Sequence, residues 1–274
     1  MLSTNARKGS RFAVVLVALL TCMSLSAAPS EADEKAAQGR EVMGKWSKAV
    51  ITIEVTTKMR MVREGRETGE QEIKGEARAA VIRPDGLAVL SLSQVDPTNL
   101  LSSSGEGEEG LRWETEITDL KMRLASGKQV PAKIVLRDKD LDLAFARPAQ
   151  KPDEPMPALD LTDSAKPEIL DEIVILGRLG EVANRAPTVC LDRVRAIVDK
   201  PRTMYVPGLD SMMLGPGCPV FSLNGKVLGL LVVRTMSSGT GGTGLSSSSL
   251  SDTNTMPMIL PVAEILEVAK QVAG

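Results

Sequence analysis

The chain carries the residue types of nucleophilic catalysis but lacks the base that this chemistry most often uses. It has three cysteines, many serines and lysines and 35 acidic residues, and there is no histidine among its 274 residues. A serine or cysteine nucleophile needs a neighbouring group that titrates near neutral pH to take its proton. The composition therefore excludes Ser-His-Asp and Cys-His mechanisms. A Ser-Lys pair stays open, although no pair of these residues is marked by its sequence context.

The first 28 residues have the pattern of a secretory signal peptide. Basic residues in the first eleven positions precede an apolar run, Phe12–Leu20, and the small residues before Ala28 suit cleavage there. A lipoprotein attached through Cys22 is the less favoured alternative, because Thr21 fits a lipid-attachment box poorly. No later segment approaches the ~20 apolar residues of a membrane-spanning helix. We therefore expect an exported protein, periplasmic or secreted.

Charge and cysteine content narrow the function classes of the mature chain. Cleavage removes three basic and no acidic residues, leaving 30 Lys and Arg against 35 Asp and Glu, a net charge of −5 instead of −2. A mildly acidic chain without a basic stripe is unsuited to nucleic acid, and no cofactor or metal motif is present. Cys190 and Cys218 remain, and an exported protein permits a disulfide between them. The alternative is a buried thiol.

Short β-branched segments separated by turn residues indicate an all-β fold. Two turns carry the strongest signals: Pro84-Asp85-Gly86, and Asn224-Gly225 between alternating apolar residues. One helix is expected near the C-terminus, from Pro261 to Ala273. The expected strands are 49–57, 76–82, 87–92, 117–124, 130–136, 173–177, 187–198, 220–223 and 226–233. Residues 29–44 are expected to be a mobile leader, and Arg63–Glu72, Gly105–Gly110 and Ser237–Ser251 to be surface loops.

The order of these features over residues 76–274 resembles that of HtrA/Deg-type trypsin-like serine proteases. Five segments in the family's order carry the likeness. Among them are the strand–turn–strand at Ala80–Ser91, the hairpin leading into Asp142-Leu-Ala, and Gly217-Cys218-Pro219 before the Asn-Gly hairpin. The resemblance implies two antiparallel six-stranded β-barrels, at residues 45–150 and 155–274, the second including the C-terminal helix.

The residues at the expected catalytic positions depart from the family pattern. Gln94 stands where the family has its catalytic histidine, and its amide cannot carry a proton at neutral pH. In an ungapped alignment from Pro219, Pro216 falls at the nucleophile position, and proline has no N–H to offer an oxyanion. In an alignment on Pro216-Gly217, the family's Asn-Ser pair is deleted, so the serine is absent in either case. Of the three triad positions, only Asp142 has the residue of the family pattern, and the chain has no histidine that it could orient. The resemblance therefore implies a protease fold with degenerate triad positions.

The sequence predicts a non-catalytic protease homologue that binds a peptide or a protein partner, an active protease homologue among the candidates. The resemblance places Met212, Met213, Gly217 and Val233 along the cleft between the barrels, where an extended peptide would bind. The alternative is a serine-type endopeptidase that works through an unconventional site.

Overall fold

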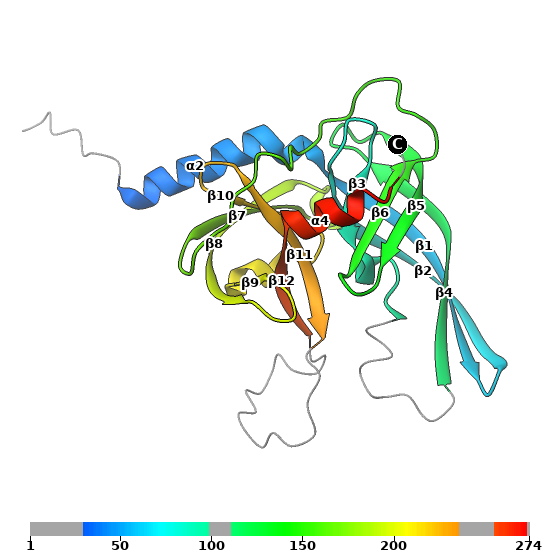
Figure 1. The fold of residues 1–274 in the computed structure, drawn as a ribbon. Helices are drawn as coiled ribbons and strands as arrows, with labels where there is room; N and C mark the ends of the chain where they lie inside the picture. The colour runs from blue at the N-terminus through cyan, green and yellow to red at the C-terminus, as the bar shows by residue number, and fades with distance from the viewer. Residues whose placement is uncertain (1–29, 99–110, 236–254, 273–274) are drawn as a thin grey trace, which may run out of the picture. The chain divides into compact units, whose positions relative to one another are not determined.

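The computed structural model of the chain describes residues 30–98, 111–235 and 255–272. The expected signal peptide with Cys22, the segment Gly105–Gly110 and the tract Ser237–Ser251 lie outside these residues. Contacts divide the chain into two units, residues 1–37 and 38–274. The second unit contains both β-barrels (Figure 1).

The first barrel is a closed antiparallel sheet. Its strands follow the order β1-β2-β3-β6-β5-β4 around the barrel. Their bounds are β1 Val50–Arg63, β2 Arg66–Val81, β3 Ala88–Ser91, β4 Leu111–Arg123, β5 Gln129–Asp138 and β6 Leu143–Pro148.

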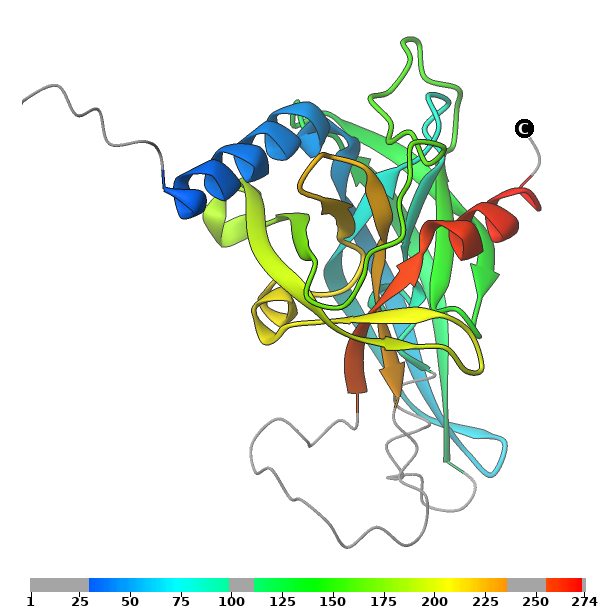
Figure 2. The same cartoon turned by 60° about the vertical axis from the view of Figure 1, so that its left-hand side comes forward.

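The second barrel has the order β10-β11-β12-β9-β8-β7 and is followed by the helix α4, Val262–Ala269. Figures 1 and 2 both show α4 beside β11 and β12. The strand bounds are β7 Glu172–Arg178, β8 Pro187–Val198, β9 Met204–Pro207, β10 Pro219–Ser222, β11 Val227–Thr235 and β12 Thr255–Pro261. The predicted pair of antiparallel six-stranded barrels with a C-terminal helix is confirmed.

The two turns with the strongest sequence signals connect neighbouring strands. Gly86, between β2 and β3, has φ +88°, and the Asp85 carboxylate accepts the Leu87 amide at 3.0 Å. Gly225, between β10 and β11, has φ +79°. Left-handed backbone is open to glycine at little steric cost, which is why these turns could be predicted.

The predicted loop at Arg63–Glu72 is wrong, because this segment is the end of a long β1–β2 hairpin. Its turn is Glu64-Gly65, both at positive φ as a two-residue hairpin turn requires. Charged side chains of this hairpin pair across the strands. Arg60 binds Glu70 at 3.1 Å on β2 and Glu116 at 2.6 Å on β4. These cross-strand pairs make a charged segment compatible with a strand.

The prediction of a mobile leader at residues 29–44 is corrected, because the structure has a helix, α2, at Glu31–Trp46. Within residues 30–37, Ser30 and Asp33 cap the helix reciprocally: the Asp33 amide donates to Ser30 Oγ at 3.2 Å, and the Ser30 amide donates to Asp33 Oδ2 at 3.3 Å. Within residues 38–46, Val42 is buried, and the indole of Trp46 stacks on Phe221 and donates to the Gly225 carbonyl at 3.2 Å. Burial of Val42 and Trp46 against the second barrel supplies packing energy that the polar composition did not indicate.

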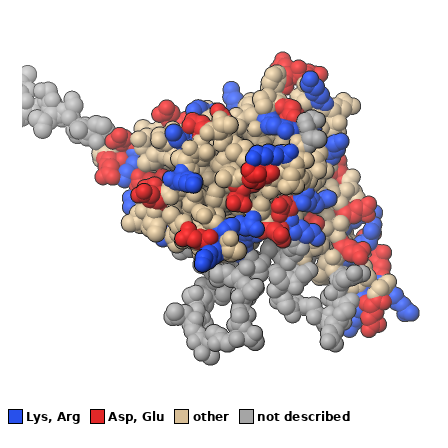
Figure 3. Space-filling view, viewed as in Figure 1, with Lys and Arg blue, Asp and Glu red and all other residues tan. Residues whose placement is uncertain are grey.

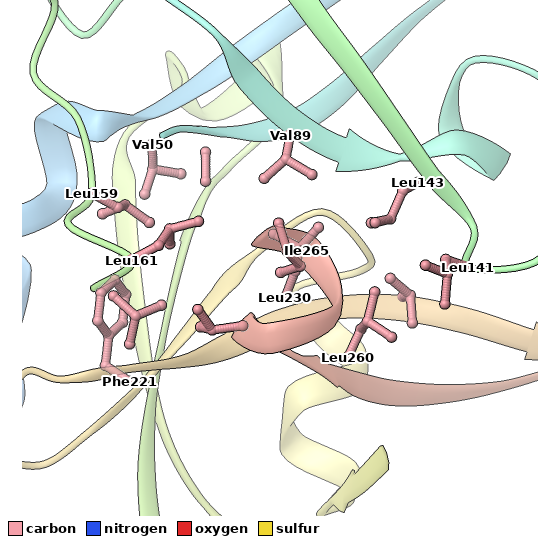
Figure 4. Packing of buried hydrophobic residues seen from close by; sticks show 14 of the residues in the cluster. Val50, Val89, Leu141, Leu143, Leu159, Leu161, Phe221, Leu230, Leu260 and Ile265 are labelled. Atoms are coloured by element: carbon pink, nitrogen blue, oxygen red, sulfur yellow. The ribbon is translucent and has the colours of Figure 1, made fainter. Parts of the chain in front are cut away.

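One apolar core is shared by the two barrels and α4. Figure 4 shows Val89 and Leu143 of the first barrel facing Leu230 and Leu260 of the second, with Ile265 of α4 between them. Each barrel has a further apolar cluster of its own. The shared core holds the two barrels in a fixed relation, and this relation determines which polar residues meet between them.

Three short 3₁₀ helices complete the part of the chain that positions the site. They are η3 Leu92–Gln94, η4 Glu181–Ala183 and η5 Leu209–Met213. A fourth, η2 Ser47–Ala49, connects α2 to β1.

Candidate functional site

The structure brings Gln94, Asp142 and Pro216 together between the barrels. Gln94 ends η3, Asp142 precedes β6, and Pro216 lies in the loop before β10. The side-chain amide of Gln94 donates to the Pro216 carbonyl at 2.7 Å, across the barrel boundary. Ser93, the neighbour of Gln94, donates its backbone N–H to Asp142 at 2.8 Å. The three positions singled out in the sequence are therefore neighbours in space.

Asp142 is a buried carboxylate surrounded by hydrogen-bond donors. It accepts the hydroxyl of Ser91, the backbone amide and hydroxyl of Ser93, and the backbone amide of Val233 in the second barrel at 3.1 Å. Its φ of +56° is tolerated better by Asp than by most residues. Burial raises the pKa of Asp142, and the hydrogen bonds from Ser91, Val233 and Ser93 oppose this shift. The carboxylate thus joins the barrels through main-chain and hydroxyl donors.

Gln94 uses both ends of its amide. Its oxygen accepts the backbone N–H of Arg78 on β2 at 3.0 Å, while its nitrogen donates to Pro216. An amide can hold such a bridge because it contains a donor and an acceptor together. It has no pKa near neutrality, so it cannot serve as a proton-transfer group there.

The loop containing Pro216 approaches β2 without space for a side chain at Gly217. Gly215 has φ +73° and Gly217 has φ +81°. A Cβ added at Gly217 would overlap the Arg78 carbonyl oxygen and lie 2.5 Å from Gln94 Nε2. The Gly217 amide donates to the Leu231 carbonyl at 2.7 Å, and Pro216 has no amide hydrogen. Neither residue therefore presents a free N–H to an oxyanion.

The four residues expected along a cleft have different environments. Met213 is 88% exposed, whereas Gly217 is buried under Arg78 and Gln94 and offers no open surface. Val233 is partly buried, and its amide is bound to Asp142. Met212 lies in η5, and the structure does not describe its side chain.

The predicted disulfide between Cys190 and Cys218 is wrong in this structure, where both are free thiols. Cys190 is on β8, and Cys218 directly precedes β10. Strand β7 separates them: its Ile175 pairs with Cys190 on one side and Val220 on the other. Neighbouring strands are about 4.8 Å apart, so β8 and β10 are about 10 Å apart. A disulfide needs Cα atoms within about 7 Å.

Two arginines between the barrels were not identified from the sequence. Arg178 on β7 is buried and donates to the carbonyls of Val50 at 2.5 Å, Ser47 at 3.0 Å and Arg185 at 3.1 Å. Burial lowers the pKa of its guanidinium. Arg78 Nε in turn donates to the Arg178 carbonyl at 3.1 Å. Apart from Arg185, which is 7 residues from Arg178, these partners are 100 to 131 residues apart in the chain, so no local pattern could reveal them.

Surface cavities among the described residues are lined by other parts of the chain. The first, about 700 Å³, lies between α4 and residues 158–162, and another, about 640 Å³, lies beside residues 149–157. A third, about 410 Å³, is lined mostly by charged residues that pair with one another, such as Arg185 with Glu76. In the described ranges, no group of three or more acidic or cysteine residues could hold a metal ion.

Figure 3 shows basic and acidic side chains intermixed on the face in view. Of the helices in the described part of the chain, none combines the length and apolar character needed to cross a membrane.

Comparisons with known proteins agree with this architecture. Residues 81–230, more than half of the chain, match the family model described as trypsin-like peptidase domain. The fold is similar to the crystal structure of the serine endoprotease from Yersinia pestis, with a TM-score of 0.54 and 12% sequence identity over 85% of this chain and 66% of that chain. It is also similar to the apo MamO protease domain from Magnetospirillum magneticum, with a TM-score of 0.51 and 14% identity over 82% and 97% of the two chains. At these identities, the similarities establish the fold alone. No curated protein matched the sequence.

Proposed function

Because the chain belongs to the trypsin-like peptidase domain family and contains no histidine, we propose that it is a non-catalytic member that binds a peptide or a protein partner. The HtrA/Deg-type resemblance and export through a signal peptide are parts of the same proposal. The observation that carries it is the hydrogen bond from Gln94 to the Pro216 carbonyl. A neutral amide is thus bound to this loop at the position where the resemblance expects an imidazole.

The surroundings of Pro216 support the absence of acyl-transfer chemistry. A nucleophile and nearby N–H donors for the developing oxyanion are the parts that such a reaction needs. Pro216 provides neither, and the Gly217 amide is already bound to Leu231.

Other nucleophiles near the site are also unsuited. Burial raises the pKa of the Cys218 thiol to about 12, so it carries almost no thiolate at neutral pH. Ser91 is fully buried and donates to Asp142. A serine-type endopeptidase with an unconventional site remains the alternative, and direct labelling separates it from the proposal.

We place the partner surface at the mouth of the inter-barrel region, next to the exposed Met213. A flexible thioether at 88% exposure suits adaptable apolar contacts. Residues 232–235 of β11 pair with β12 but extend beyond the register in which β10 pairs with β11. Extended peptides commonly bind along such strand edges. Apolar and main-chain contacts predict an affinity that depends weakly on salt.

The test has a catalytic and a binding part. Mature protein is treated with a serine-reactive fluorophosphonate and assayed on casein; labelling or turnover above background that one Ser or Lys substitution abolishes would support the alternative. Partners are then captured with wild type, Met213→Glu and the control Val182→Glu, which alters another exposed residue, in η4. We expect loss of capture with Met213→Glu only. Equal capture by both folded variants would place the partner surface elsewhere.

A further inference from the structure

The segment Gly215–Gly217 sits in a slot formed by the first barrel. One wall of the slot is the backbone of Arg78 on β2, and the other is the side chain of Gln94 on η3. The slot is preformed, because the Arg78 amide fixes the Gln94 oxygen at 3.0 Å and thereby points the Gln94 nitrogen toward the loop. Arg78 is itself anchored by its side-chain bond to the Arg178 carbonyl.

Two features of the slot select what can occupy it. The Gln94 side-chain amide donates a hydrogen bond to a main-chain carbonyl, here that of Pro216 at 2.7 Å. The Arg78 carbonyl excludes a side chain at the next position, since a Cβ on Gly217 would overlap it. A hydrogen bond to the main chain combined with a steric filter for side chains is how peptide-binding grooves obtain affinity and specificity.

The two ends of the segment are held differently. On its C-terminal side, Cys218 is buried and the Gly217 amide is bound to Leu231 in β11. On its N-terminal side, Leu214 is also buried, whereas Met213, one residue further, is 88% exposed. The segment can therefore leave the slot only if Leu214 moves out of the core, while the attachment to β11 stays in place.

We infer that the Arg78–Gln94 slot is a recognition site for a Pro-Gly segment, occupied by this chain's own Pro216-Gly217 and open to a competing Pro-Gly peptide from a partner. The inference rests on the proposed peptide-binding function and names its ligand class. An internal ligand lowers the apparent affinity for an external one by the fraction of time that the slot is free.

The probe is a synthetic peptide that copies residues 214–219, acetyl-Leu-Gly-Pro-Gly-Ser-Pro-amide, with serine in place of Cys218. Its control has alanine at the second glycine. Binding is followed by fluorescence anisotropy of labelled peptides and checked by calorimetry.

The key variant is Gly217→Ala, which excludes the chain's own segment from the slot. Gly65→Ala is its matched control, because Gly65 also has positive φ, +78°, but nothing lies within 4 Å of an added Cβ. We expect Gly217→Ala to bind the glycine peptide at least ten-fold more tightly than wild type or Gly65→Ala. Neither variant should bind the alanine peptide.

A second variant tests the receptor side of the slot. Gln94→Glu keeps an oxygen for the Arg78 amide but loses the N–H₂ donor. We expect it to abolish peptide binding, alone and combined with Gly217→Ala. If Gly217→Ala fails to fold by circular dichroism, wild type is compared with Gln94→Glu at millimolar peptide, where only wild type should bind.

Three results would overturn the slot as a recognition site. The first is equal affinity of Gly217→Ala and Gly65→Ala for the glycine peptide. The second is an increase in peptide affinity by Gly217→Ala that persists when Gln94→Glu is added. The third is binding of the alanine peptide as tight as that of the glycine peptide. None of them bears on turnover or on capture through Met213. Failure of this inference is therefore distinguishable from failure of the proposed function.

Discussion

The carboxylate of Asp142, at the start of β6, accepts the backbone amide of Val233, on β11, at 3.1 Å, and so joins the two barrels directly. The other donors to Asp142 come from Ser91 and Ser93 of the first barrel. A residue that the family resemblance would assign to catalysis thus has a complete set of structural partners.

Replacing Asp142 by Ala should destabilise the fold. The change leaves the partly buried amides of Ser93 and Val233 without their acceptor and places Ala at a φ of +56°. Each unsatisfied buried group costs about 1–3 kcal/mol. We therefore expect the free energy of unfolding, measured with urea, to fall by roughly 2–4 kcal/mol. Asp142→Asn, which retains an acceptor and tolerates this backbone, should lose less. A loss below about 0.5 kcal/mol for Asp142→Ala would contradict the bridging role.

The pH dependence of stability should carry the signature of Asp142. Burial raises its folded-state pKa above the unfolded value, so ionised Asp142 lowers stability at neutral pH. As the pH falls from 7 through the raised pKa, the folded protein takes up the proton first, and this penalty disappears. The free energy of unfolding of wild type should therefore rise relative to that of Asp142→Asn between pH 7 and pH 4. A constant or falling difference would show that the carboxylate is not desolvated.

Thiol chemistry should distinguish the two cysteines of the mature protein. Mass spectrometry after alkylation in denaturant should find Cys190 and Cys218 both free. In the native protein Cys190, which is partly exposed, should react slowly, because burial and the nearby Asp192 and Asp210 raise its pKa. Cys218 should react only on unfolding. A linked peptide pair in a non-reducing digest would restore the disulfide prediction.

Introducing histidine at position 94 should not create a protease. Gln94→His supplies a base, but Pro216 still has no hydroxyl, and members of a catalytic triad act as a unit. We expect casein and ester turnover of Gln94→His to equal that of wild type. The substitution should also remove the bridge between Arg78 and Pro216, which hydrogen exchange of the two segments would detect as faster exchange. Turnover above wild type in this variant would show that the site holds an unrecognised nucleophile.

Local sequence determined the elements whose causes are local. Glycine at positive φ in the Pro84-Asp85-Gly86 and Asn224-Gly225 turns, together with the alternation of apolar residues around them, placed the hairpins and the all-β class. The two segments that were predicted wrongly depend instead on contacts with residues far away in the chain. The charges of Arg63–Glu72 are exposed but lie on a hairpin, which the sequence did not indicate because their cross-strand partners were unknown. The polar leader concealed a helix whose Val42 and Trp46 pack on residues about 180 positions later.

By itself, the sequence determined that this protein has no histidine and therefore no Ser-His-Asp chemistry, because composition does not depend on folding. Only the tertiary structure decided what the remaining site residues do. The pairing of β7 between β8 and β10 keeps Cys190 and Cys218 apart, and the packing of the two barrels brings Gln94 to Pro216, 122 residues away. Hydrogen bonds and close contacts act over a few ångströms in space, so the fold, and not distance along the chain, selects the partners.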